Sequence, residues 1–208
     1  MIPALAMLCI VVFEGKRYMI ISLFSALFAL LLFACGYEKK NTGTKRMVVA
    51  SAMTALCFAG RFIPVFKPVS AMTIITGMYM GSETGFLVGA MTALVSDFYF
   101  GQGPWTPFQM LAWGLIGYIA GVLSKPLKKS RIFLIVWGAF SGLLFSLIMD
   151  LWSVLWYSGE LTIKLYLAAF VTALPHTVIY AVSNAVFLYL LEKPFGEKLS
   201  RLRIKGGF

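Results

Sequence analysis

The residues best suited to ligand chemistry lie in one stretch, residues 96–109, which joins two apolar runs. Three polar side chains of this stretch, Asp97, Gln102 and Gln109, can hydrogen-bond to a ligand and orient it. Aromatic rings alternate with them, at Phe98, Tyr99, Phe100, Trp105 and Phe108. Glycines and prolines in the same stretch end regular structure, while the rings offer a large contact surface. The stretch therefore indicates either the wall of a binding site or an interfacial loop whose rings lie among lipid headgroups.

Three further candidates, Asp150, His176 and Tyr180, lie within apolar runs nearer the C-terminus. Ionisable residues at membrane depth are costly and are functional candidates by default. His176 and Tyr180 are four residues apart, so a helix would place them on one face. The alternatives are structural: an ion pair of Asp150 with Arg61 or Lys67, and a packing role for His176.

Known catalytic motifs are missing from the sequence. A single histidine cannot build a multi-histidine metal site, and neither a GxSxG nor an HExxH motif occurs. No Walker A motif occurs, so ATP-driven transport would need an ATPase on another chain. We therefore predict a protein that is not an enzyme and that holds no metal or other cofactor. An intramembrane enzyme would need Asp97 and Asp150 to approach each other or a metal.

The composition predicts an integral membrane protein. Hydrophobic residues make up 60% of the 208-residue chain and charged residues only 12%, and the mean hydropathy is +0.87. A soluble domain usually carries about twice that share of charge. The net charge of +10 does not indicate nucleic-acid binding, because the basic residues lie in short loops between apolar runs, as in cytoplasmic loops of membrane proteins.

Eight apolar segments must position the candidate residues. The first two, residues 2–13 and 18–36, predict an N-terminal hydrophobic hairpin over residues 1–37, although the first is short for a full membrane crossing. A basic cytoplasmic linker follows over residues 38–46. The remaining six segments predict an all-α membrane core over residues 47–192, with a basic cytoplasmic tail over residues 193–208. These six are residues 47–60, 69–80, 84–98, 107–123, 132–157 and 165–191.

The distribution of basic residues predicts the orientation. If all segments cross, thirteen of the 18 lysine and arginine residues fall on one side, which should be the cytoplasmic side. Both termini then lie in the cytoplasm, in a multi-pass protein of the cell membrane. The connection at residues 61–67, the stretch at 96–109 and the turn around Glu160 lie outside.

Small residues form stripes on several of these segments. Ser51, Ala55 and Ala59 recur every four positions, so they share one helix face, where another helix can approach closely. Packing inside the protein would bury this stripe, whereas docking of a partner would leave it exposed. Two further stripes lie later in the chain, at Gly85, Gly89 and Ala93 and at Gly117 and Gly121.

From about Lys45 to the C-terminus, the chain resembles the substrate-binding S components of energy-coupling factor (ECF) transporters. The resemblance rests on SAMTALCFAGR, on FKPVSAMTIITGMYMGSETGFLVGAMTALVSDFYFGQGPWTPFQMLAWGLIGYIAG and on ALPHTVIYAVSNAVFLYLLEKPFGEKL. It implies a six-helix core that binds a vitamin or related micronutrient at the outer face. It also implies docking on a membrane coupling subunit with two cytoplasmic ATPases, and toppling in the membrane to release the substrate. The docking face in this family matches Ala55 and Ala59, with Ser51 where alanine is expected.

The middle stretch is similar to the branch that includes a cobalamin carrier, so a corrinoid is the expected substrate. The alternatives are an S component for a smaller vitamin or a nucleobase-like precursor, and a stand-alone membrane carrier or assembly protein. Thirteen residues are candidates for substrate binding in an S component. They are the polar anchors Asp97, Gln102, Gln109 and Asp150, the aromatic walls Phe98, Tyr99, Trp105, Trp113, Trp152 and Tyr180, and secondarily Arg61, Lys67 and His176.

Overall fold

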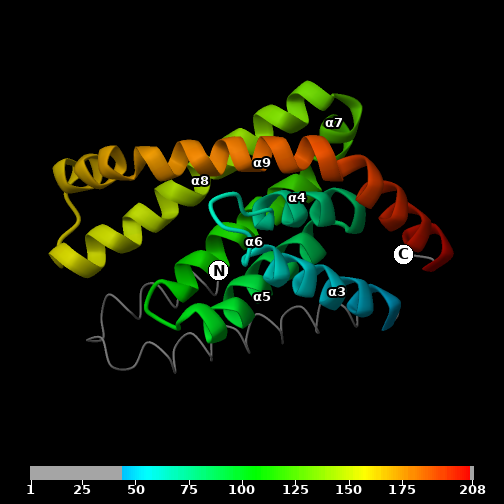
Figure 1. The fold of residues 1–208 in the computed structure, drawn as a ribbon, viewed down its shortest axis with the longest axis horizontal. Coiled ribbons are helices and arrows are strands. Elements are labelled where there is room, and N and C mark those ends of the chain that lie inside the picture. The colour runs from blue at the N-terminus through cyan, green and yellow to red at the C-terminus, as the bar shows by residue number, and fades with distance from the viewer. Residues whose placement is uncertain (1–43, 207–208) are drawn as a thin grey trace.

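The structure, a computed structural model, describes residues 44–206 (Figure 1). The predicted hairpin and most of the linker that follows it lie outside the described residues. Within residues 44–206 the secondary structure is entirely helical, which confirms the all-α prediction for this part of the chain. The helices are α3 (Thr44–Gly60), α4 (Val69–Met80), α5 (Ser82–Phe100), α6 (Thr106–Val122), α7 (Ser124–Lys129), α8 (Arg131–Ser158) and α9 (Ile163–Gly206).

Helix α4 lies at the centre of the fold and packs against α3, α5, α6 and α9. Eleven of its twelve residues are buried, as expected for a helix that is apolar on every side. Thr73 and Thr76 satisfy their hydroxyls within the helix, since each donates to the carbonyl four residues earlier at 2.8 Å. This short helix is therefore enclosed by protein, which is the condition for a helix too short to span a membrane.

Glycines let α4, α5 and α6 approach closely. Gly77 of α4, Gly85 of α5 and Gly117 of α6 meet where the three helices cross, and a Cβ on any of them would overlap a neighbouring backbone atom. The later small-residue stripes predicted from the sequence thus serve packing inside the protein.

Helices α8 and α9 form a long antiparallel pair that crosses over the other helices (Figure 1). They have 28 and 44 residues, and in the described part of the chain they alone are long and apolar enough to cross a membrane. Helix α9 continues fifteen residues past the predicted end at position 191, because its last turns keep an apolar face. Leu199 on that face is buried in the core.

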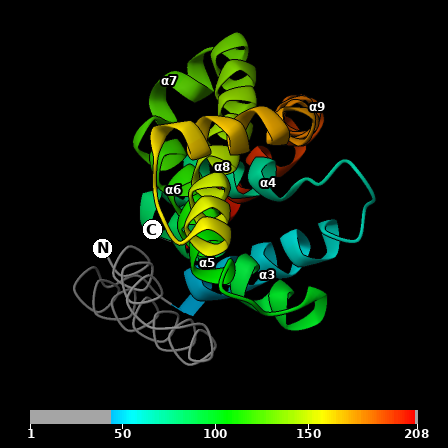
Figure 2. The ribbon, with the colours of Figure 1, turned by 90° about the vertical axis from the view of Figure 1, so that its left-hand side faces the viewer.

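The two ends of the molecule differ in charge. The basic helix α7 and the basic end of α9 lie at one end (Figure 1), and the turn between α8 and α9 lies at the other end, which faces the viewer in Figure 2. At the basic end, the Lys128 ammonium lies 4.1 Å from the centre of the Tyr79 ring, and the Tyr79 hydroxyl donates to Glu192 at 2.6 Å. These contacts join α4, α7 and α9.

Candidate functional site

A buried ion pair organises the candidate site. Asp97 on α5 is only 1% exposed, and the Arg61 guanidinium, just past the end of α3, donates to it at 2.7 Å. Arg61 also donates to the Ser96 hydroxyl. A buried carboxylate is stable only when it is paired and hydrogen-bonded, so this contact fixes the end of α3 against α5.

Helix α6 completes the coordination of Asp97. The Thr106 hydroxyl donates to the second carboxylate oxygen at 2.7 Å. With its amide nitrogen turned toward Asp97, Gln109 lies 3.2 and 3.3 Å from the two carboxylate oxygens. Asp97 therefore joins three helices and holds Arg61 in place, and its role as a direct ligand anchor stays a prediction.

The Arg61 guanidinium is held between aromatic rings. It lies 4.8 Å from the centre of the Phe100 ring and 5.3 Å from that of Trp113, within the range of cation–π attraction. Helix α5 reaches Phe100 because Gly101 ends it with a φ of +111°, a conformation that favours glycine.

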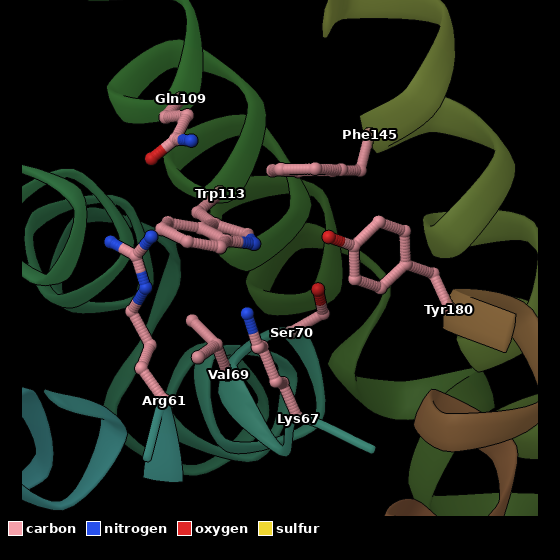
Figure 3. Close-up of a pocket in the computed structure, with 8 residues that line it drawn as sticks. All are labelled: Arg61, Lys67, Val69, Ser70, Gln109, Trp113, Phe145 and Tyr180. Carbon is pink, nitrogen blue, oxygen red and sulfur yellow. The ribbon is translucent and has the colours of Figure 1, made fainter. Parts of the chain in front are cut away.

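Beside this ion pair lies a small cavity (Figure 3). Trp113 and Phe145 stack at its wall, with ring centroids 5.2 Å apart and planes 22° apart, and Tyr180 meets Phe145 edge-on at 5.3 Å. The lining residues come from α4, α6, α8, α9 and the connection at 61–68, and are Arg61, Lys67, Val69, Ser70, Gln109, Trp113, Phe145 and Tyr180.

The cavity has a volume of about 30 Å³, enough for water-sized groups. Sites for vitamin-sized ligands usually have several hundred Å³. A ligand of that size would fit here only if the aromatic wall or the connection at 61–68 moved outward.

Lys67 reaches the cavity from the connection between α3 and α4. Its backbone carbonyl accepts a hydrogen bond from the Ser183 hydroxyl at 3.2 Å, which ties the connection to α9. Partial burial and the nearby Arg61 lower the pKa of Lys67 below its ordinary value. Besides Arg61, the site therefore contains the Lys67 ammonium, which makes no ion pair with any described residue.

A second group of predicted residues lies apart from the residues that line the cavity. Trp105 and Trp152 pack edge-to-face with ring centroids 5.7 Å apart. Asp150 is 7% exposed, and its Oδ2 atom has no hydrogen-bond partner among the described residues. Within residues 44–206, Asp150 forms an ion pair with neither of the alternative partners, Arg61 and Lys67, and Arg61 pairs with Asp97 instead.

Three predicted residues face away from the cavity. Phe98 and Tyr99 are 66% and 67% exposed, and Tyr99 packs with Phe62 at 5.0 Å in an outer aromatic cluster. His176 lies on the exposed side of α9, although Tyr180, one turn later, lines the cavity. Gln102 donates to a backbone carbonyl within the 94–102 segment at 3.3 Å.

Five of the thirteen predicted residues line the cavity together: Arg61, Lys67, Gln109, Trp113 and Tyr180. Sequence reasoning missed Val69, Ser70 and Phe145. Ser70 is the second residue of α4, which begins directly after Pro68. The proline marks a helix start in the sequence, and this signal could have indicated Ser70. Phe145 lies inside a long apolar run, where nothing distinguishes it.

The stripe of Ser51, Ala55 and Ala59 is exposed on α3 in the part of the chain that the structure describes. These small residues therefore do not serve packing against the described helices. Across residues 44–206, no three histidine, cysteine, aspartate or glutamate side chains are grouped to hold a metal ion.

Comparison with known proteins identifies a family. The family model described as "ECF-type riboflavin transporter, S component" matches residues 41–196, about three quarters of the chain. Searches of curated proteins and of solved structures returned no match.

Proposed function

Since this chain belongs to the family of ECF-type riboflavin transporter S components, we propose that it captures a flavin-like vitamin at the outer face of the cell membrane and delivers it inward. As a family member, it is a membrane-bound, substrate-binding subunit of an ATP-driven transporter and not an enzyme. The family match over residues 41–196 carries this conclusion.

A flavin fits the chemistry of the site better than the corrinoid expected from the sequence, which the family match does not support. The family name points to riboflavin. If the stacked rings of Trp113 and Phe145 move apart, a flat ring system of similar thickness can enter and stack against them. A corrinoid would need a far wider opening of a cavity of about 30 Å³.

The proposed topology keeps the six-helix core over residues 47–192 and the N-terminal hairpin over residues 1–37. Both termini would lie in the cytoplasm, because basic loops collect on the cytoplasmic side. The gathering of α7 and the end of α9 at one end of the molecule supports this orientation (Figure 1).

Docking on the coupling subunit would use the exposed face of α3. Ser51, Ala55 and Ala59 present little side-chain bulk there, so a partner helix can approach the backbone closely. Two cytoplasmic ATPases would supply the energy, and the whole body would topple to release the substrate. A stand-alone carrier or assembly protein would have no use for this exposed stripe.

Riboflavin binding by the purified full chain in detergent tests the proposal, with quenching of flavin fluorescence as the readout. We expect Trp113→Ala to weaken binding about tenfold or more, because it removes one wall of the ring site. The matched control is Trp156→Ala, since Trp156 is 40% exposed and does not line the cavity. Equal affinity in both variants, or no binding by a folded chain, would contradict the proposal.

Co-purification tests the partner. The chain expressed with a coupling subunit and its two ATPases should elute with them as one complex. Elution of the chain alone, with riboflavin still bound, would favour the stand-alone alternative.

A further inference from the structure

Several hydrogen-bond donors that line the cavity have no acceptor among residues 44–206. Four groups point toward its centre: the Lys67 ammonium, the Ser70 hydroxyl, the Trp113 indole N–H and the Tyr180 hydroxyl (Figure 3). These come from the 61–68 connection and from α4, α6 and α9. Ammonium and indole groups can only donate, and hydroxyl groups can donate as well as accept.

None of these four groups makes a hydrogen bond or ion pair to another described residue. Ser70 as a whole residue is only 7% exposed, and it lines the cavity. It also lies in the first turn of α4, where backbone N–H groups lack acceptors within the helix and the helix dipole favours negative charge.

The charges around the cavity do not balance. Arg61 is neutralised by Asp97 at 2.7 Å, and Thr106 and Gln109 occupy the remaining lone pairs of that carboxylate. Lys67 is left with no acidic partner in residues 44–206. A partly buried cation surrounded by unused donors is arranged for an anion.

We propose that this centre binds an anionic group of the transported ligand, a phosphate or a carboxylate, while the ring system of that ligand lies against Trp113. The inference rests on the proposed function and narrows it: the preferred ligand is a ring-bearing micronutrient with a negative charge, such as a flavin phosphate, which binds more tightly than its neutral counterpart.

The position of Lys67 suits this role. The Ser183 hydroxyl holds its backbone carbonyl, and Pro68 restricts the backbone of Lys67, the residue before it, so the ammonium is presented from a fixed point. An anion at this point would offset the burial and the repulsion from Arg61 that lower the pKa of Lys67.

The experiment compares neutral and anionic members of matched ligand pairs by thermal shift of the full chain in detergent, in a phosphate-free buffer. The pairs are riboflavin and riboflavin 5′-phosphate, pyridoxine and pyridoxine 5′-phosphate, and nicotinamide and nicotinate. The first two pairs test a phosphate and the third a carboxylate. Lys67→Gln removes the proposed charge, and Lys164→Gln, an exposed lysine at the start of α9, is the matched control.

We expect the anionic member of one pair to bind at least about tenfold more tightly than the neutral member, as for a charged hydrogen bond. Lys67→Gln should abolish that preference and Lys164→Gln should keep it. In the unmodified chain, added salt should weaken binding of the anionic ligand and leave binding of the neutral ligand unaffected. This second measurement tests the proposal even if Lys67→Gln fails to fold.

The outcomes separate the two proposals. If riboflavin binds as tightly as its phosphate and Lys67→Gln does not alter the ratio, the anion site is refuted and the flavin function stands. If an anionic ligand other than a flavin binds through Lys67, the anion site is supported and the flavin assignment fails. If none of the six compounds stabilises the folded chain, both are refuted.

Discussion

Replacing Asp97 with asparagine tests whether the buried ion pair organises the site. The substitution keeps the shape of the side chain and removes its charge. The Arg61 side chain, only 11% exposed, then stays in the protein interior without a counter-charge from the described residues. The Thr106 hydroxyl can still donate to the amide oxygen. The amide nitrogen then faces the Arg61 guanidinium, so the change removes the charge together with one hydrogen-bond acceptor.

The expected cost follows from the burial of both partners. Removing one partner of a buried pair typically costs about 3–5 kcal/mol. Arg61 keeps its hydrogen bond to Ser96 and its contacts with two aromatic rings, so we expect the lower end, about 3 kcal/mol. For a chain of this length, about 2–4 °C of melting midpoint corresponds to 1 kcal/mol, which gives a fall of roughly 6–12 °C.

The assay is thermal unfolding of the full chain in detergent. The control is Glu160→Gln, which removes an acid from the exposed turn between α8 and α9 and should leave the midpoint unchanged. Adding Arg61→Gln to Asp97→Asn should cost less than the sum of the two single changes, because both break the same contact. A midpoint for Asp97→Asn within about 2 °C of the control, or strict additivity, would refute the reasoning.

Three other predictions concern the docking face, the helix packing and the pH dependence. Ala55→Leu should reduce co-purification with the coupling subunit about tenfold without weakening ligand binding. Ala168→Leu, on the exposed side of α9, should change neither co-purification nor ligand binding. Loss of ligand binding by Ala55→Leu would contradict a docking role. Gly117→Ala should lower the free energy of unfolding by about 1–3 kcal/mol, because the added Cβ would overlap the α5 backbone. Val122→Ala, at an exposed position of the same helix, should change the free energy of unfolding little. Equal melting midpoints of the two variants would rule out this close crossing. The pKa of Lys67, which faces Arg61 and Tyr180, is lowered in the folded chain. Between that lowered pKa and the ordinary lysine pKa, the unfolded chain therefore binds more protons than the folded chain. The stability of the unliganded chain should rise with pH over this range. Affinity for an anionic ligand should fall over the same pH range, and a thermal-shift series in which both quantities change in the same direction would contradict the assignment.

The positions of the helices could be predicted because local residues set them. The apolar run at 69–80 lies between Pro68 and Gly81, which end regular structure on both sides, and α4 has these bounds. The close crossing of α5 and α6 was likewise signalled by glycines at helical spacing. These features depend on neighbours in the sequence.

The composition of the site could be predicted only in part, because it depends on contacts between distant residues. Asp97 and Arg61 are 36 positions apart, and the sequence analysis considered Asp150, and not Asp97, as a partner for Arg61. Phe98 and Tyr99 were expected in the site because residues 96–109 were interpreted as a loop. Helix α5 instead continues through them, and helical geometry turns their rings outward when Asp97 points inward.

The unequal lengths of the helices have a consequence for the surrounding lipid. At about 1.5 Å per residue, α8 is roughly 42 Å long, well beyond a hydrocarbon layer of about 30 Å, and α4 is far shorter. Protein encloses α4, so the mismatch falls on α8 and α9, which must lean or stretch the bilayer locally. Lipids with shorter acyl chains would increase the resting lean of this pair, and under the proposed toppling mechanism they would shorten the rotation that remains before release.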